Sequence, residues 1–239
     1  MKLISFQLSG RHGHFLKAEG AASALSYPVP PRTVLLGIMG AVLGLSKDEP
    51  QQLLEPANIA LCGKIPLTHW HKAKLRKDPP APLPMIIKKN QKGTSADEKA
   101  TLILQEWLFK PDYTVWVSVP EPYLSELERR LTERRWYFQP SLGLSEMMAD
   151  LQYLTSGEAL ALPKDEYPVV TVFSPNDAEM DMNKIFEHNL AIHALRMPRN
   201  VTSDRVFSHA PYYLERNARP VYVNTDKAFS FENEVLMFL

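Results

Sequence analysis

The sequence predicts an α+β protein: a ferredoxin-like domain with a basic protruding arm and a small C-terminal β-rich part. Two observations carry this prediction. Segments typical of strand, helix and strand occur twice in succession, which is the order of a split βαβ unit. A basic, proline-rich stretch between residues 69 and 99 separates the two halves of this pattern, and short β-rich runs follow from about residue 145. We therefore expect one domain over residues 1–144, including the arm, and a part over residues 145–239 that completes or flanks the core.

The first two elements are a strand over residues 2–8 and a helix from about Pro31 to Leu45. Apolar residues at alternate positions give the strand one strongly apolar face. Three prolines at positions 28, 30 and 31 keep the preceding chain extended, so the helix can begin only at about Pro31. The helix is apolar on nearly every side, with one thin face formed by Gly37, Gly40, Ala41 and Gly44. Because glycine inside a helix costs about 1 kcal/mol relative to alanine, we expect a sheet, another helix or a polyphosphate chain to approach this face closely.

The later elements are predicted from the same kinds of signal. Residues 51–54 form a helical turn, and residues 57–68 form a strand that is interrupted by Gly63 and Pro66. Residues 101–109 and 113–119 are joined as a hairpin, and a helix then extends to about Trp136 with Leu124, Leu127 and Leu131 on one buried stripe. Further strands are expected over residues 169–173, 185–196 and 206–224, with a basic loop over residues 196–205.

Composition excludes several classes of protein. The 239 residues contain 27 Lys and Arg and 27 Asp and Glu, so the chain is neutral and is not a globally basic nucleic-acid binder, although a local basic patch is allowed. The single Cys62 excludes a disulfide framework and a cysteine-rich zinc site. The single cysteine fits a reducing cytoplasm, where we expect the protein to be. We expect no membrane contact, because the apolar run over residues 34–45 is far shorter than the roughly 20 residues of a membrane span. No spacing typical of a metal site or a nucleotide-phosphate loop occurs, so neither a metal nor a cofactor is expected.

Basic residues accumulate in the predicted arm. Residues 69–99 contain ten His, Lys and Arg residues against three acidic ones, with four prolines in the middle. Two interpretations are open. The stretch is either a solvated surface loop that happens to be basic, or an arm laid along a phosphate backbone.

A second candidate nucleic-acid site lies before and at the start of the first helix. The loop over residues 11–17 supplies Arg11, His12, His14 and Lys17 with Phe15 interleaved. Arg32 and Thr33 occupy the first helical turn, where free N–H groups favour a phosphate, and Tyr27 could stack on a base. The plain alternatives are that Phe15 and Tyr27 belong to the core and that Arg32 pairs with a neighbouring acid. The arginines at positions 129, 130, 134 and 135 are interpreted as a solvated helix face.

Several runs resemble the CRISPR-associated RAMP subunit, the "Cas-five" family, that caps the 5′ end of the guide RNA in type I Cascade. At the N-terminus these are Phe6-Gln-Leu-Ser-Gly10, His14-Phe15, Ser26-Tyr-Pro-Val-Pro-Pro-Arg-Thr33 and Gly37-Ile-Met-Gly-Ala41. Weaker matches follow at Gln105-Glu-Trp-Leu108, Pro111-Asp-Tyr-Thr-Val115 and Leu142-Gly-Leu-Ser-Glu146. The Pro30-Pro31-Arg32-Thr33 form is similar to the type I-B branch, in which a separate subunit cuts the RNA.

The resemblance implies a non-catalytic RNA-binding subunit of a CRISPR effector complex. It implies that the chain caps the 5′ handle of the CRISPR RNA, contacts the backbone subunit through its arm, and docks the large subunit that reads the protospacer-adjacent motif of the target DNA. The residues we expect to contact the handle are Arg11, His14, Lys17, Tyr27, Arg32 and Thr33. The residues we expect to contact phosphates along the arm are Lys72, Lys74, Arg76, Lys77, Lys88 and Lys89.

Two alternatives stay open at this point. The chain could be a metal-independent endoribonuclease that processes repeat RNA, with acid–base groups from His69, His71 and Lys72 or from His12, His14 and Lys17. The cutting branch of the family uses a tyrosine at the end of the first helix, where this chain has Leu43, so no catalytic residue is expected. The third interpretation is a pure protein–protein scaffold, which predicts no affinity for RNA.

Overall fold

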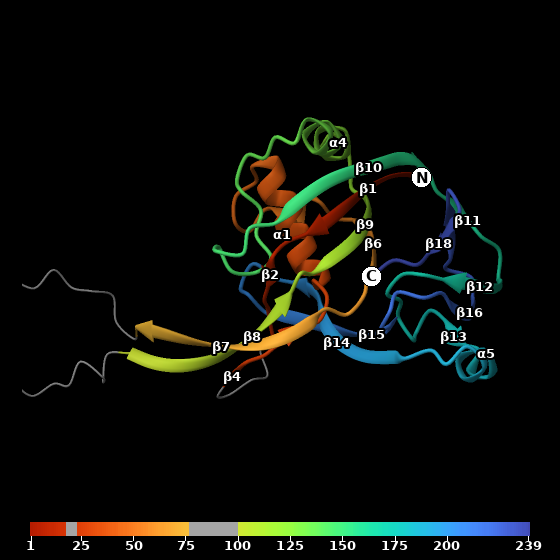
Figure 1. Cartoon of the computed structure of the whole chain (residues 1–239). Coiled ribbons are helices and arrows are strands. Elements are labelled where there is room, and N and C mark those ends of the chain that lie inside the picture. Colours follow the sequence, from red (N-terminus) through yellow and green to blue (C-terminus); the bar gives the residue numbers. More distant parts are fainter. Residues whose placement is uncertain (18–22, 77–99) are drawn as a thin grey trace, which may run out of the picture.

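Four strands form the central sheet of the protein. The computed structural model describes residues 1–17, 23–76 and 100–239. The sheet is antiparallel with the order β10-β1-β9-β6. Its strands are β1 (Lys2–Ser9), β6 (Asn58–Cys62), β9 (Asp112–Ser118) and β10 (Asp150–Glu158). The main helices are α1 (Arg32–Leu43) and α4 (Tyr123–Glu133), with a short α2 (Pro50–Leu53) after α1 (Figure 1). The chain is therefore a strand-rich α+β protein, as predicted.

Alternation along β1 decides which face of the sheet the helices cover. Ile4, Phe6 and Leu8 are fully buried in one cluster with the apolar residues of α1 and α4, including the predicted leucine stripe of α4. Leu3 points to the other face, where it joins Trp116 and residues near the C-terminus in a second cluster. The central sheet is thus buried on both sides, and a shift of one residue in register would exchange the two sets of side chains between two differently packed cores.

The thin face of α1 is approached closely at two of its glycines. A Cβ atom at Gly40 would collide with the ring of Pro50 in α2, and one at Gly44 would collide with Tyr137. Gly44 also ends the helix in the left-handed conformation with φ 84°. The predicted close approach is confirmed at these two positions. At Gly37, however, an added Cβ would meet nothing within 4 Å.

The arm begins as a long antiparallel ribbon that leaves the body of the molecule (Figure 1). It consists of β7 (Leu67–Arg76) and β8 (Ala100–Phe109), paired along their whole length. Near its root β8 also pairs with β2 (His12–Gly13) and β4 (Ser23–Ala24), while β3 (Phe15–Leu16) pairs with β5 (Ser26–Tyr27). The prediction that residues 101–109 form a hairpin with residues 113–119 was wrong. Lys110 and Pro111 instead lead the chain from the arm into the central sheet, where β9 pairs with β1 and β6.

The C-terminal part consists of a second sheet, a two-stranded ribbon and a short helix. The sheet has the order β11-β17-β18-β12-β16-β13. Its strands are β11 (Leu160–Ala161), β12 (Asp165–Val169), β13 (Glu179–Met180), β16 (Val221–Thr225), β17 (Phe229–Phe231) and β18 (Glu234–Leu236). The ribbon is β14 (Ile192–Val201) with β15 (Phe207–Glu215), and the helix is α5 (Met182–Glu187).

Four sequence expectations for this part need correction. Residues 185–196 are not one strand, because Asp181 caps α5 by accepting hydrogen bonds from the N–H groups of Asn183 and Lys184. The basic stretch 196–205 is not a loop, since β14 carries it as far as Val201. The expected strands over 169–173 and 206–224 are shorter, because β12 ends at Val169 and a turn separates β15 from β16.

The two predicted parts share the central sheet. β10 lies beyond residue 144 and pairs with β1 over the length of that strand. The second sheet packs on the face that the helices leave open, where Phe231 and Leu236 meet Leu3 and Trp116. The chain after residue 144 therefore supplies one edge strand of the core as well as a covering layer.

A buried ion pair fixes the start of α1. Arg32 is only 3% exposed, and its guanidinium forms a bidentate pair with both carboxylate oxygens of Glu55. It also donates to the Ala57 carbonyl oxygen at 2.8 Å and to Asn200 Oδ1 at 3.3 Å. One side chain thereby joins α1 to the segment that enters β6 and to β14.

We predict that Glu55→Gln lowers the free energy of unfolding by about 2–4 kcal/mol, because it leaves a buried guanidinium without its counter-charge. Burial alone would raise the pKa of Glu55, but hydrogen bonds from Arg32 and the Ala57 N–H outweigh it and the pKa is lowered. The stabilisation is therefore present above the ordinary pKa of 4.5 and is lost as the pH falls through the lowered value.

Denaturant unfolding of both proteins between pH 3 and pH 7 tests this. The stability difference should be largest near pH 7 and should shrink in acid. The exposed Glu187→Gln serves as the control and should leave stability within about 0.5 kcal/mol of wild type. A Glu55→Gln protein as stable as this control at pH 7 would contradict the prediction.

Candidate nucleic-acid interface

Five rings gather on one face of the arm at its root. His12 comes from β2, His69 and His71 from β7, and Trp107 and Phe109 from β8. The register places His69 opposite Trp107 and His12 opposite Phe109, and alternation along the strands brings all five side chains to the same face. We call these five residues the ring cluster.

Trp107 is the centre of the ring cluster. His71 stacks on it with ring centroids 4.1 Å apart, and His12 and His69 lie 5.4 Å and 5.7 Å from it. His69 and His71 are exposed and Phe109 is 41% exposed, whereas His12 and Trp107 are half-buried. The cluster therefore presents flat ring surfaces to solvent, which is the surface on which unstacked bases pack in single-strand binding proteins.

Two exposed cations stand beside the ring cluster. The Lys110 N–H donates to the Arg11 carbonyl oxygen at 3.0 Å, so the two side chains leave neighbouring points of the backbone. Lys110 Nζ lies 5.4 Å from the centroid of the Phe109 ring. Rings for bases and cations for phosphates are thus side by side at the root of the arm.

The opposite face of the arm carries lysines and apolar residues. Lys72 and Lys74 alternate with His69 and His71 along β7 and are exposed. Their cross-strand partners are Leu104 and Leu102, which are 42% and 70% exposed, and Trp70 on the same face is 53% exposed. We call this the lysine face of the arm.

The sequence-predicted site residues divide by burial. His14 and Tyr27 are buried, like Arg32, whereas Lys17 and Thr33 are half-buried and Arg11, Lys72 and Lys74 are exposed. His14 Nδ1 lies 2.8 Å from the Glu106 carbonyl oxygen, and Lys17 Nζ lies 5.5 Å from the Tyr27 ring centroid. Arg76 belongs to β7, but its side chain and all of Lys77, Lys88 and Lys89 lie outside the described residues.

Burial bears out the plain alternatives for three residues. Phe15 and Tyr27 are each 2% exposed and pair across β3 and β5 in the core, and Arg32 pairs with Glu55. These three side chains stabilise the interior of the protein. Their contact with RNA stays a prediction that the geometry does not favour, whereas Arg11 stands beside the ring cluster.

Sequence reasoning missed Trp107, Phe109 and Lys110 as site residues. The signal was the alternation of rings in both arm strands: His69 and His71 in one, Trp107 and Phe109 in the other. It became informative only once β8 was paired with β7.

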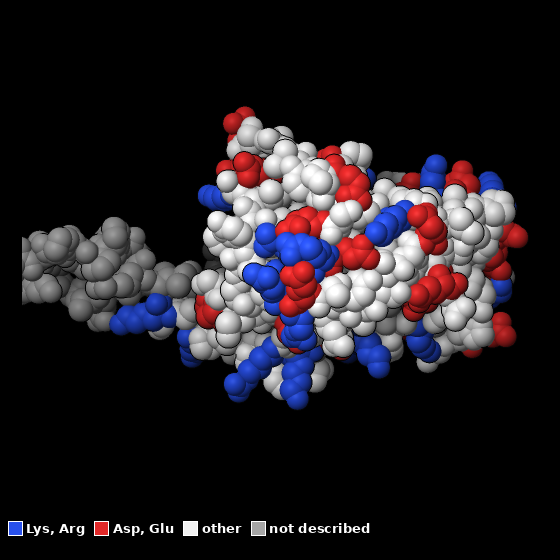
Figure 2. Space-filling model, turned by 90° about the horizontal axis from the view of Figure 1, so that it is seen from above, with Lys and Arg blue, Asp and Glu red and all other residues white. Residues whose placement is uncertain are grey.

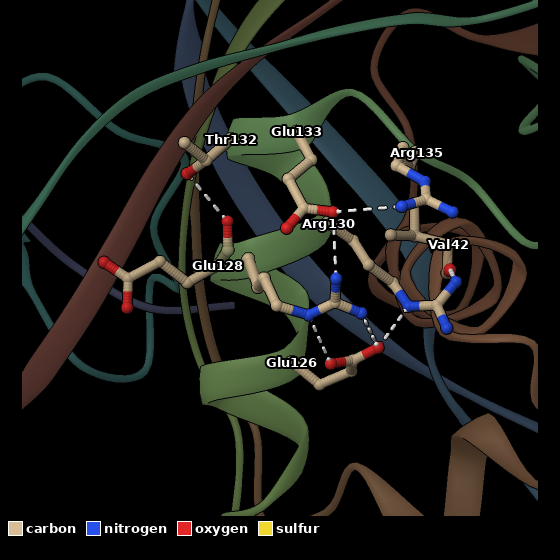
Figure 3. A network of polar contacts seen from close by, with 8 residues as sticks. Val42, Glu126, Glu128, Arg130, Thr132, Glu133 and Arg135 are labelled. Atoms are coloured by element: carbon tan, nitrogen blue, oxygen red, sulfur yellow. Dashed lines mark hydrogen bonds and ion pairs between the residues drawn. The ribbon is translucent and has the colours of Figure 1, made fainter.

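A second charged surface lies over α4 but is internally neutralised. Figure 2 looks down on it and shows basic and acidic side chains interleaved. Glu126 accepts from both Arg129 and Arg130, and the hydrogen bonds from these arginines lower its pKa to about 2. Glu133 pairs with Arg129 and Arg135, and Arg130 also donates to the Val42 carbonyl oxygen (Figure 3). Of the four arginines interpreted as a solvated helix face, only Arg129 and Arg130 belong to α4, and Arg130 is half-buried, whereas Arg134 and Arg135 are exposed beyond its end.

Two imidazoles of the ring cluster, His12 and His69, also lie against each other. His12 and His69 have ring centroids 5.4 Å apart in an edge-on arrangement. Desolvation, helped by the neighbouring His69 and Arg11, lowers the pKa of His12 below its ordinary 6.5. His12 is therefore neutral at pH 7 and serves there as an uncharged ring.

Two further properties concern the described part of the chain. Within residues 1–17, 23–76 and 100–239, no group of three or more His, Cys, Asp or Glu side chains is placed to hold a metal ion. The helices in these ranges are all too short or too polar to cross a bilayer.

Comparisons with known proteins agree with the resemblance in the sequence. The family model described as CRISPR-associated protein (Cas_Cas5) matches residues 3–206. The structure is similar to a chain described as "CRISPR RNA-guided surveillance complex", with 16% identity, a TM-score of 0.58 and coverage of 92% of this chain and 91% of that one. It is also similar to a CRISPR protein from Archaeoglobus fulgidus, with 10% identity, a TM-score of 0.57 and coverage of 100% and 99%. No curated protein matches the sequence.

We predict that His12 titrates below pH 6.5 and that His69→Gln moves its midpoint upward, because the electrostatic effect of the neighbouring His69, which lowers the pKa of His12, is removed. The midpoint is read from the His12 imidazole resonances in an NMR titration. The matched control is His188→Gln, which lies outside the ring cluster and should leave the midpoint in place. A His12 midpoint at or above 6.5 in the wild type would show that the ring cluster does not desolvate this imidazole.

Proposed function

The chain belongs to the CRISPR-associated Cas5 family, and on this premise we propose that it is a non-catalytic RNA-binding subunit of a CRISPR effector complex. Its work in this proposal is to cap the 5′ handle of the CRISPR RNA. The observation that carries the proposal is the ring cluster with Arg11 and Lys110 beside it. Stacking surfaces next to cations are what single-stranded RNA requires of a protein.

We propose that the core domain is ferredoxin-like. The order β10-β1-β9-β6 and the placement of α1 and α4 between strands of the same antiparallel sheet support this assignment. In that arrangement the arm is an insertion between β6 and β9, and its root lies at the end of β1 where Ser9 pairs with Asp112.

The lysine face of the arm is the part we assign to a protein partner. Trp70, Leu102 and Leu104 expose apolar surface on a ribbon that projects from the body, and such surface is normally covered by a partner. In this proposal the partner is the backbone subunit of the complex, and the body docks the large subunit near the target DNA. Lys72 and Lys74 then lie where phosphates of the RNA could reach them at the edge of that contact.

The absence of a catalytic tyrosine argues against processing activity. Leu43, at the position that the cutting branch fills with tyrosine, is half-buried against the core. The juxtaposition of His12 and His69 is the observation that favours the alternative, a metal-independent endoribonuclease. The two functions differ in a directly measurable product.

We predict that the purified chain binds single-stranded 5′-handle RNA with an affinity that falls as salt is added. Each phosphate contact contributes about 0.7 to the slope of log K against log salt, so Arg11→Ala with Lys110→Ala should reduce the slope by about 1.4. Trp107→Ala should weaken binding roughly fivefold or more with little change in slope, because stacking is not ionic. Fluorescence anisotropy with labelled RNA measures all three proteins.

Lys164→Ala with Lys227→Ala is the matched control, since it removes the same charge from exposed positions outside the arm. An equal loss in this control would mean that binding follows net charge and not the root of the arm. If the wild-type protein has no measurable affinity for RNA, the interpretation as a protein–protein scaffold is favoured instead.

We further predict that repeat RNA incubated with the chain in EDTA stays intact. Denaturing gels of end-labelled RNA give the readout. Site-specific cutting that disappears in His12→Gln or His69→Gln would replace the proposed function by the processing nuclease, whereas cutting that both variants retain would point to a contaminant.

A further inference from the structure

A groove runs beside the exposed glycine of α1. Its walls are α1, the chain around α2, and the turn of the β14–β15 ribbon, and its volume is about 460 Å³. Its lining includes Thr33, Gly37, Gln51, Gln52, Arg205 and Phe207. A volume of this size is within the usual range for small-ligand sites and is enough for one nucleotide.

Gly37 is the unexplained residue of this groove. It is exposed within a helix, and an added Cβ would meet no atom of the chain within 4 Å. Alanine at this position would therefore stabilise the helix. Glycine lowers helix stability by about 1 kcal/mol relative to alanine, and no close packing within the chain requires it here. Gly40 and Gly44 are explained by Pro50 and Tyr137, so the third glycine indicates a close approach by something outside the chain.

The charges of the groove indicate a neutral ligand group. Arg205 is paired with Asp48 at 2.5 Å across the wall, which leaves Lys47 as the cation of the lining without a carboxylate partner within 4.0 Å among the described residues. A site built for a phosphate would concentrate unpaired cations or free backbone N–H groups instead. The groove thus differs from the root of the arm, where Arg11 and Lys110 are exposed.

The hydrogen-bonding groups of the groove are suited to a base edge. Gln51, Gln52 and three hydroxyl residues supply donors and acceptors in close mixture. Gln51 Nε2 donates to the Thr33 carbonyl oxygen at 3.0 Å, which holds this amide in place along the helix. Phe207 is 46% exposed and forms an apolar wall of the groove. Binding of a peptide would require a longer apolar groove with pockets for side chains.

We propose that this groove holds one unstacked nucleobase of single-stranded RNA, with the base lying over Gly37 of α1. The base edge meets Gln51 and Gln52, and Phe207 packs against the ring. Lys47 stands at the rim for the attached phosphate. This inference rests on the proposed RNA-binding function and adds a second RNA contact, on a different part of the chain from the ring cluster.

The test uses the full chain and a labelled 5′-handle RNA with Gly37→Ala and Gly37→Leu. We expect Gly37→Ala to raise the thermal midpoint by about 2–4 °C, because it improves the helix. The same change should weaken RNA binding roughly fivefold or more, because a methyl group separates the base from the helix. Greater stability together with lower affinity is an outcome that damage to the fold cannot produce. The matched controls are Thr132→Ala and Thr132→Leu on the exposed side of α4, which should leave affinity unchanged.

A second measurement identifies the base. Handle RNAs that lack one base at a time are titrated against wild type and Gly37→Leu. Removal of the base that occupies the groove should weaken binding to the wild type but should have no further effect on Gly37→Leu, whereas the other positions should be additive.

Three results would overturn the inference. Gly37→Leu with wild-type affinity, in a protein that still responds to Arg11→Ala with Lys110→Ala, would reject the groove and leave the proposed function standing. Wild-type protein without affinity for the RNA would reject both. Normal RNA affinity of Gly37→Leu combined with loss of the other subunits on co-purification would show that the groove receives a protein.

Discussion

The buried pair of Arg32 and Glu55 is the constraint from which the arrangement of the helical face follows. A guanidinium that is 3% exposed must keep its counter-charge, so the first turn of α1 is held against the segment entering β6. The contact of Arg32 with Asn200 holds β14 to the same point. Because α1, α2 and the β14–β15 ribbon are the walls of the groove, this one pair also determines the shape of the proposed base site.

Local signals were sufficient for β1, β6 and β9 of the central sheet and for its helices, whereas β10 was not predicted as a strand. Alternation predicted β1, Pro31 predicted the start of α1, and the leucine stripe predicted the buried side of α4. The end of α1 was predicted at Leu45, but Gly44 ends the helix after Leu43. The arm ribbon was not predicted, because β7 and β8 are separated by 23 residues and the sequence of neither strand identifies the strand with which it pairs. The second half of β14, after Arg196, was missed for a similar reason: its basic residues and Pro198 are typical of a loop, and only pairing with β15 makes it a strand.

Residue type was a poor guide to the site because it does not report burial. Arg32, His14 and Tyr27 have the side chains that RNA contacts require, yet each lies inside the fold with partners in the protein. Trp107 and Phe109 were overlooked because their value depends on register: only when β8 pairs with β7 do they share a face with His69 and His71. Arg11 was chosen by residue type, and it lies beside the ring cluster because the chain returns to it at Lys110; its contact with RNA stays a prediction.

The neutral charge of the chain is consistent with a protein that distinguishes one end of an RNA from the rest of it. Phosphate contacts are the same at every nucleotide, so a strongly basic surface would hold any stretch of RNA equally well. The proposed contacts, a base on Trp107 of the arm root and a base over Gly37 of α1, would instead require unstacked nucleotides at two separate places on the chain. A few cations at the arm root can then attract the strand while the shape of its end decides whether it stays. In this view Gly37, which lowers the stability of α1, and the exposed rings of the arm both help the protein to select the end of the RNA.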